Sequence, residues 1–553
     1  MKKHSLVKGF VSLVFMLCLL ITFSSPVQGA TTYFVTNTTS SGAGSLRQAI
    51  LSANANPGQD TIAFNIPTSD PGYASPLGVW VFHLTTVLPM LEDPSGVIID
   101  GSTQPGYNPD LPGLIVEHTD SILVGADLLT IVSSNNTVKN LGLFLSRGDG
   151  IVLQGSSNYI QDNQIFSSAG YGIYFGAGAD SNIVYGNNIC GHTLDAIRLF
   201  NANGAIIENN IIGVLPSYYA PAGRNQANGI TLLGSNNNVI DHNVISYNMQ
   251  IGVQLNQSIT NTIIDNTIGL DDSRTIDLGN GGHGLELLDS SNNSVTENWI
   301  SGNESDGIRL TGSLSMGNIV QQNWIGTAYS APIPNAHHGI ALYDGAHQNT
   351  IGSDSDAELY NVVLGNGWSG IVVVDSPLGA NVIGNNSIYS QGFYGIHINN
   401  SPGNAIVSNR VAGNGVLGNS AGVRVENSSG ISDTTDYNLL WSNQIFNNYG
   451  KGIQLVGDAN NNISRPIILS ASCSQVSGTA CPDCWVQVFS DLYDEGRYYD
   501  GLTTADGSGH FSVAIHATGQ NITAVAIDVP GNSSEFSLAY TACFRVSLPI
   551  LMK

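Results

Sequence analysis

The chain has 553 residues, of which 64 are glycine and only 10% are Asp, Glu, Lys or Arg, against roughly 25% in an average soluble domain. With 42% hydrophobic residues the chain is not a disordered polymer. Asp and Glu outnumber Lys and Arg by 41 to 17, which argues against nucleic acid as a partner, because an acidic surface repels phosphate backbones.

The first 30 residues have the layout of a secretory signal peptide. Lys2, Lys3 and Lys8 precede an apolar run over 10–23, and a short polar segment then leads to Ala30. The run is shorter than the about 20 residues that a membrane-spanning helix needs, and no later segment is longer, so we expect no transmembrane segment in the mature chain. Removing residues 1–30 leaves 14 basic residues against 41 acidic ones, a net charge of −27. The sequence predicts a secreted or cell-surface protein.

Residues 31–120 are predicted to form an N-terminal α/β cap and the first coils. Residues 33–36 and 61–64 have the composition of strands. Between them Ser45 is placed to cap a helix that carries an apolar face. The residues of that face are Leu46, Ala49, Ile50 and Ala53.

A repeat over residues 121–463 decides the fold class. A four-residue word (Gly or once Ala, apolar, any, apolar) recurs twelve times at intervals of 22 to 33 residues. The alternation of apolar and variable positions predicts a very short strand with one buried face in every repeat. The words begin at Gly150, Gly172, Ala196, Gly229, Gly252, Gly284, Gly307, Gly339, Gly370, Gly395, Gly422 and Gly452.

A second word, Asn-x-Ile or Asn-x-Val, lies between most of these strands, as at Asn163, Asn243 and Asn298. Asparagine tolerates the backbone conformations that turn a corner, and stacked asparagine amides can hydrogen-bond up and down a ladder. Coils of this size with three short strands predict an all-β fold, a right-handed parallel β-helix. A propeller blade would need about 40 residues, and the pattern of leucine-rich repeats is absent.

Three intervals are about ten residues longer than their neighbours and alternate with short ones. The extra residues lie over 213–228, 269–283 and 326–338. Because all three leave the coil at the same corner, we expect a row of loops on one edge of the rod, which could serve as a binding rim.

The repeat words resemble those of bacterial exported right-handed β-helix proteins of the pectin-lyase-like superfamily, over roughly residues 120–460. Residues 44–50 likewise resemble the N-terminal cap motif of such proteins. The resemblance implies the fold. It does not imply one activity, because the superfamily includes lyases, hydrolases, epimerases, adhesins and proteins without known activity.

Residues 464–542 change to longer strands separated by turns, and are similar to the small β-sandwich modules of bacterial surface proteins. The module could cap, space or anchor the rod. Its cysteines suggest disulfides between Cys481 and Cys484 and between Cys473 and Cys543, with a zinc site as the alternative. Cys190 is expected to be a buried thiol. The tail over 543–553 lacks the elements of a sortase signal.

Four charged residues of adjacent coils could share an exposed face: His283, Glu286, Asp306 and Arg309. Glu286 and Arg309 occupy the same outward column, so a salt bridge is one interpretation. A hydrolytic site is the other, because polysaccharide-cleaving β-helices use carboxylates and basic residues on successive coils.

One acidic segment offers a candidate metal site. Asp354, Asp356 and Glu358 could hold calcium, or could belong to a solvated acidic loop. No other cofactor is expected, and the scattered Met and His residues do not favour copper.

Trp299 and Trp324 are each the middle residue of an Asn-Trp-Ile word and lie one coil apart. Two stacked, exposed tryptophans would form a platform for sugar rings, whereas a loop could instead bury them. We therefore expect an exported β-helix that binds polysaccharide or another cell-surface partner without cleaving it. The alternatives are a polysaccharide lyase or glycoside hydrolase, and a structural stalk without a specific ligand.

Overall fold

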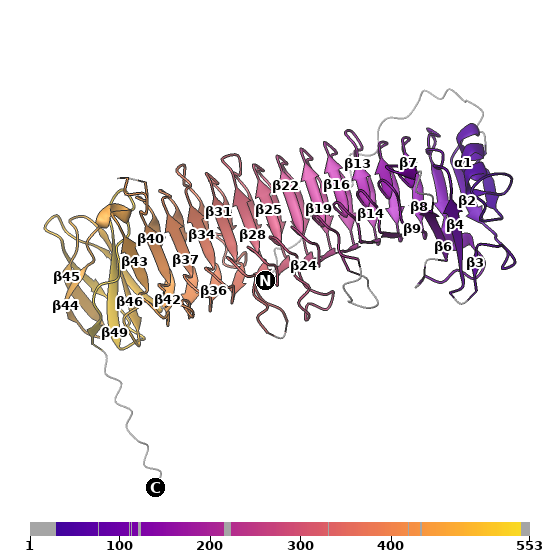
Figure 1. Ribbon diagram of the computed structural model, residues 1–553. Helices are drawn as coiled ribbons and strands as arrows, with labels where there is room; N and C mark the ends of the chain where they lie inside the picture. Colours follow the sequence, from indigo (N-terminus) through magenta and orange to yellow (C-terminus); the bar gives the residue numbers. More distant parts are fainter. Residues whose placement is uncertain are drawn as a thin grey trace, which may run out of the picture.

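The computed structural model describes residues 29–75, 77–109, 111, 113–119, 123–214, 223–329, 331–418, 420–431 and 434–542. The expected signal peptide therefore lies almost wholly outside the described residues. In the described part of the chain, no helix has the length and apolar character needed to cross a membrane. Figure 1 shows a rod that runs from an N-terminal cap to a C-terminal module.

The rod is built from three long sheets, and each coil adds one strand to each sheet. Sheet A comprises β1 (Thr32–Val35), β2 (Asp60–Phe64), β5 (Val97–Asp100), β8 (Thr137–Lys139), β11 (Tyr159–Gln161), β14 (Ile183–Tyr185), β17 (Ile206–Glu208), β20 (Val239–Asp241), β23 (Thr262–Ile264), β26 (Ser294–Thr296), β29 (Ile319–Gln321), β32 (Thr350–Gly352), β35 (Val382–Gly384), β38 (Ala405–Val407) and β41 (Leu439–Trp441). Sheet B comprises β3 (Tyr73–Ala74), β4 (Val79–Leu84), β6 (Leu114–His118), β9 (Gly142–Phe144), β12 (Gln164–Phe166), β15 (Asn188–Cys190), β18 (Ile211–Ile212), β21 (Val244–Ile245), β24 (Thr267–Ile268), β27 (Trp299–Ile300), β30 (Trp324–Ile325), β33 (Val362–Leu364), β36 (Ser387–Tyr389), β39 (Arg410–Ala412) and β42 (Gln444–Phe446). Sheet C comprises β7 (Leu129–Ile131), β10 (Ile151–Leu153), β13 (Ile173–Phe175), β16 (Ile197–Phe200), β19 (Ile230–Leu233), β22 (Val253–Asn256), β25 (Leu285–Leu288), β28 (Ile308–Thr311), β31 (Ile340–Tyr343), β34 (Ile371–Val374), β37 (Ile396–Asn399), β40 (Val423–Glu426) and β43 (Ile453–Val456).

The predicted right-handed parallel β-helix is confirmed. The twelve glycine words are the strands β10 to β43 of sheet C, and equivalent residues stack in register, as Leu285 does on Ile308. Their apolar columns are buried in one continuous core along the rod. The first strand of sheet C, β7, was not predicted from the repeat, because Leu128 stands where the later words have glycine or alanine.

The glycine that begins eleven of the twelve words lies at a tight corner, where Ala196 is the one exception. A Cβ on Gly284 would lie 2.4 Å from Ile300 Cγ2 and 2.7 Å from the carbonyl oxygen of Gly307. Contacts this short exclude an ordinary side chain. The word therefore marks the point where the chain passes closely over the next coil before it enters sheet C.

The expected asparagine ladder is present. The Nδ2 of Asn266 donates to Asn298 Oδ1 at 3.0 Å, and Asn298 Nδ2 donates to Asn323 Oδ1 at 3.0 Å, with all three side chains buried. The left-handed conformation falls on the residue before the asparagine, as at Asp265 (φ 49°). Asparagine is therefore needed at these corners for its amide and not for its backbone freedom.

The N-terminal cap agrees with the sequence prediction. The helix α1 (Leu46–Ala55) begins after Ser45, whose Oγ accepts the backbone N–H of Gln48 at 3.2 Å. The four residues predicted to share a face are the ones that α1 buries against the end of the rod. Short 3-10 helices lie at η1 (Gly101–Thr103) and η3 (Ala459–Asn462).

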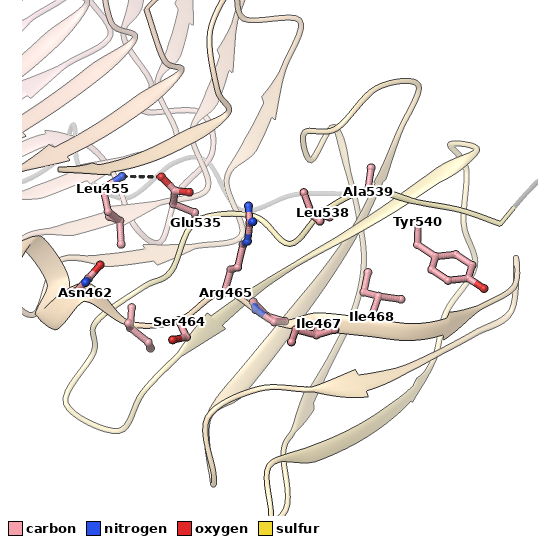
Figure 2. A pocket seen from close by; sticks show the side chains of 12 residues that line it. Leu455, Asn462, Ser464, Arg465, Ile467, Ile468, Glu535, Leu538, Ala539 and Tyr540 are labelled. Carbon is pink, nitrogen blue, oxygen red and sulfur yellow. Dashed lines mark hydrogen bonds between the residues drawn. The ribbon is translucent and has the colours of Figure 1, made fainter.

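Beyond η3 the chain forms two antiparallel sheets that close the other end of the rod (Figure 1). Side chains of this module occupy the free edges of the last coil: Gln487 accepts the N–H of Ser442, Ser533 that of Leu440, and Glu535 that of Leu455 (Figure 2). A sheet edge left open would invite aggregation, so the contacts support the capping role. The strands are β44 (Ile467–Ala471), β45 (Gln475–Thr479) and β48 (His510–Ala514) in one sheet, and β47 (Tyr498–Thr504), β46 (Trp485–Asp491), β49 (Asn521–Ile527) and β50 (Tyr540–Thr541) in the other.

The three described cysteines of the module are oxidised. Cys481 and Cys484 form the predicted disulfide, with Cα atoms 5.4 Å apart. Cys473 is also disulfide-bonded, but its predicted partner, Cys543, lies outside the described residues. Cys190 is a buried free thiol.

Candidate functional site

His283 and Asp306 belong to a row of corner residues that hold successive coils together. The backbone N–H of Asp306 donates to His283 Nδ1 at 3.2 Å, and the N–H of His338 donates to Asp306 Oδ1 at 3.1 Å. His338 repeats the pattern, because its Nδ1 accepts the N–H of Ser369 at 3.2 Å. The expectation that His283 and Asp306 share an exposed face is wrong for Asp306, which is only 3% exposed, and the bonds to the next coil were not predicted from the sequence.

The environment keeps the His283 ring neutral. Burial, with the nearby charges of Arg309 and His337, lowers the pKa of His283 to about 4. Nδ1 accepts the Asp306 backbone N–H, and Arg309 Nη1 lies 3.5 Å from Nε2, so both ring nitrogens face groups of the protein. A ring in this state has no free lone pair with which to take a proton from a substrate. The bond pattern therefore disfavours His283 as a general base.

Glu286 and Arg309 face each other across adjacent strands, as expected. Arg309 Nε lies 3.9 Å from Glu286 Oε1, and Nη1 lies 3.9 Å from Asp306 Oδ2, so both contacts are ion pairs without close hydrogen bonds. The guanidinium also lies over the ring of Tyr343, 4.8 Å from its centre. Glu286 accepts a hydrogen bond from Gln254 Nε2 at 2.8 Å. These contacts form a polar border on the outward face of sheet C.

Next to this border the outward face of sheet C carries an apolar groove of about 480 Å³, which we call the aromatic groove. Trp368, 44% exposed, stacks on His337 with ring centres 4.2 Å apart and is held edge-on by His338. Outward residues of β34 line the groove, and Phe393 comes from the corner of the next coil. The lining residues are His338, Trp368, Ser369, Val372, Val374, Phe393, Tyr394 and His397.

Sequence reasoning missed Trp368. It lies two residues before the glycine word of Gly370, at a corner position that the strand patterns did not cover. The available signal was a tryptophan at a position where most other words have glycine or a polar residue.

The Trp299–Trp324 pair is stacked, but it is not an open platform. The rings are paired in register with centres 5.0 Å apart and planes 10° apart. Tyr329 packs on Trp299 at 4.6 Å, and the Arg274 guanidinium lies 5.3 Å from the same ring, so Trp299 is only 7% exposed. The expectation that both rings are exposed is therefore wrong for Trp299, because the long loops of two coils fold over it.

Two of the three predicted loops, 269–283 and 326–338, lie next to each other, and residues 215–222 of the first lie outside the described residues. The loops carrying Arg274 and Tyr329 project from one edge of the rod (Figure 1) and contact each other, since the Tyr329 N–H donates to the Arg274 carbonyl at 3.2 Å. Arg274 is fixed in turn by Asp265, with Nη2 and Oδ1 3.0 Å apart. The loops therefore clamp the Trp pair, which leaves sheet C as the more open face.

The three candidate calcium ligands lie on an exposed loop. Asp356 Oδ1 accepts the backbone N–H of Glu358 at 2.9 Å, as in an ordinary turn, and Asp354 is exposed beside it. Across the described residues, no three His, Cys, Asp or Glu side chains come together as a metal site. The loop is thus arranged as a solvated acidic turn.

A larger hollow, of about 710 Å³, lies where the last coil meets the C-terminal module (Figure 2). Arg465 projects into it between Glu535 and the apolar side chains of Ile467 and Leu538. Glu535 on its wall accepts hydrogen bonds from the Leu455 N–H and from Lys451 Nζ. The hollow is therefore a cleft beside a capping contact.

Comparison with known proteins gives one family match. The model of the family described as "Periplasmic copper-binding protein (NosD)" matches residues 93–275, about a third of the chain. No curated protein matches the sequence.

Several solved structures are similar over most of the rod. The A-module of the mannuronan C-5 epimerase AlgE6 of Azotobacter vinelandii is 15% identical, with a TM-score of 0.46 over 77% of this chain and 98% of that chain. A variant of the periplasmic alginate epimerase AlgG is 13% identical, with a TM-score of 0.39 over 72% and 84%. The Dettilon tailspike protein is 13% identical, with a TM-score of 0.38 over 90% and 78%.

The matched region contains three histidines. His118 is buried, its Nδ1 accepts the Arg147 N–H at 3.4 Å, and among the described residues no group of three His, Cys, Asp or Glu side chains forms a metal site around it. The other two do not fit a copper site. His192 is fully buried, with Nδ1 accepting the Ser168 N–H and Nε2 3.0 Å from the Ile165 carbonyl oxygen. His242 is bound through both ring nitrogens to Asp241 and Asp265. Since the protein uses both nitrogens of each ring, neither has one left for a metal, and we derive no chemistry from copper.

Proposed function

We propose that this chain is an exported β-helix protein that binds an extracellular or periplasmic polysaccharide on the outward face of sheet C and does not cleave it. One observation carries the proposal: the aromatic groove, in which an exposed Trp368 is held rigidly by two histidine rings beside the apolar floor of β34. A fixed aromatic ring next to hydrogen-bonding groups suits the C–H face of a sugar.

The charge of the chain supports a neutral glycan as the partner. The net charge of −24 disfavours uronate polymers over most of the surface. The basic side chains next to the aromatic groove are already paired: Arg309 lies between Glu286 and Asp306, and Arg424 holds Glu426 at 2.7 Å. The charge of each guanidinium is therefore offset by a neighbouring carboxylate, which weakens its attraction for an anionic sugar.

Affinity electrophoresis in gels containing glucomannan, xylan, hydroxyethylcellulose or polygalacturonate would test the proposal. We expect retardation by at least one neutral polymer, a loss of about tenfold or more in affinity for Trp368→Ala, and no loss for Trp324→Ala. Reducing-sugar and unsaturated-product assays on the same polymers should remain at background. Product release would instead identify a hydrolase or lyase, and no retardation by any polymer would favour a stalk without a ligand.

A further inference from the structure

The apolar surface of sheet C continues beyond the aromatic groove in the direction of the strands. Val372 and Val374 of β34 line the groove, and the next residue, Asp375, begins a second hollow of about 400 Å³ at the opposite edge of the sheet. The two hollows therefore lie on neighbouring coils and are joined by one strand. We call the second one the edge hollow; its lining residues are Asp375, Pro377, Asn400, Pro402, Ser429, Ile431 and Thr434.

Along the rod axis, by contrast, the aromatic groove is bordered by ion-paired side chains on both sides. Towards the N-terminal cap, Arg309 lies over the ring of Tyr343. Towards the C-terminal module, Arg424 lies 5.2 Å from the ring centre of Tyr394 and is bonded to Glu426. The aromatic groove and the edge hollow together form an apolar surface that runs across the rod, which we call the lane. Charged side chains border the lane on both sides along the rod axis.

We propose that a linear neutral glycan crosses the rod parallel to the strands of sheet C, with one sugar on Trp368 and a later one in the edge hollow. This inference rests on the proposed function. β34 ends at Val374, and Asp375 (φ 52°) turns the chain towards the edge hollow. The two hollows, of about 480 and 400 Å³, share no lining residue, so a ligand that occupies both has to be an oligosaccharide.

The polar groups of the lane agree with a neutral ligand. Asp375 Oδ1 accepts a hydrogen bond from Asn400 Nδ2 at 2.9 Å, and Asn400 Oδ1 accepts the Ser429 N–H at 3.0 Å. The carboxylate at the junction of the two hollows would repel a uronate, whereas it can accept a hydrogen bond from a sugar hydroxyl.

Three substitutions to glutamate distinguish a ligand that crosses the rod from one that runs along the rod axis. Ile431→Glu places a charge in the edge hollow, where Ile431 is 63% exposed. Leu288→Glu on β25 and Gln454→Glu on β43 place the same charge three coils away from β34 on either side. Calorimetric titration of each protein with cellohexaose, mannohexaose and xylohexaose, and with the matching disaccharides, measures the effect.

For the hexaose that binds, we expect Ile431→Glu to weaken affinity at least tenfold while the two axial variants stay within twofold of the parent. Disaccharide affinity should be unchanged by Ile431→Glu, because a short ligand does not reach the edge hollow. A loss confined to the axial variants would overturn the transverse path while leaving the proposed function intact. Failure of all three hexaoses to bind the parent, or an unaltered affinity in Trp368→Ala, would overturn the proposed function itself.

Discussion

Glu495 of the C-terminal module accepts two hydrogen bonds from Asn448 of the last coil, from its backbone N–H at 3.1 Å and its Nδ2 at 3.0 Å. Asn448 is the last asparagine of a ladder that follows one corner of the rod, and Asn414 donates to it from the coil before. A carboxyl group from the turn between β46 and β47 thus takes the position that the next coil would have filled. The module therefore docks through the same pair of hydrogen bonds that joins one coil to the next, as between Asn414 and Asn448.

The state of the Glu495 carboxyl should make this docking sensitive to pH. Burial, reinforced by Asp491 and Asp494, raises the pKa of Glu495 to about 7 from its usual 4.5. A raised folded-state pKa gives stability that is complete below pH 4.5 and is lost as the pH rises through 7, by an amount on the order of 3 kcal/mol. We expect the hydrogen-exchange protection factors of the module to fall over that range.

Glu495→Gln is the matched variant, because Gln391 already serves as a member of the same ladder. Its module should show protection factors, which are corrected for the intrinsic pH dependence of exchange, that do not change between pH 4.5 and 7.5. Equal pH dependence in both proteins would mean that another group controls docking.

The corner histidines should give the opposite pH dependence. The pKa of His283 is lowered to about 4, chiefly by burial. A depressed histidine pKa contributes stability that is present above pH 6.5 and is lost as the pH falls through 4, by about 3 kcal/mol. His283→Asn keeps an acceptor for the Asp306 N–H, as Asn228 does for Ile251 at the equivalent corner.

Urea unfolding of His283→Asn between pH 4 and 7 should therefore show a weaker loss of stability in acid than the parent, with similar stability at pH 7. The exposed His510→Asn serves as the control and should follow the parent curve. A variant that parallels the parent would exclude His283 as the acid-sensitive group.

Removing one ladder asparagine should be costly. Asn298→Ala removes the acceptor of two Asn266 donors, its backbone N–H and its Nδ2. It also removes the donor to the carbonyl groups of Ile263 and Thr296. Each unsatisfied buried group costs about 1–3 kcal/mol, so the free energy of unfolding should fall by about 3 kcal/mol or more. Asn256→Ala, on the outward side of β22, should change the same urea measurement by less than about 1 kcal/mol.

The two stacked tryptophans should respond unequally to truncation. Trp299→Ala removes a ring that is covered by Arg274 and Tyr329 and should lose about 3 kcal/mol of stability. Trp324→Ala removes a ring that is only half-buried, so its loss should be smaller. Neither change should weaken glycan retardation in the gels. A large loss of binding in a folded Trp324→Ala protein would instead show that the ligand binds at the Trp299–Trp324 pair on sheet B.

The sequence alone determined the repeat, because strand alternation and close-packed corners are local requirements that every coil must meet again. Gly284 is glycine for a contact with the next coil, and Asn298 is asparagine for a bond to the next coil, so each leaves its mark at a fixed spacing. The Ser45 cap of α1 could be predicted for the same reason, since it depends on residues only three apart.

Only the tertiary structure decided which outward residues meet solvent. Trp299 and Trp368 are both outside the core, yet one is covered and the other is exposed. The cover comes from Arg274 and Tyr329, which lie 25 and 30 residues away in sequence on loops that vary between coils. Exposure on a solenoid surface depends on such long-range loop contacts, and the spacing of a repeat does not encode their geometry. The hydrogen bond from the Asp306 N–H to His283 likewise joins residues of different coils and could not be predicted from the sequence.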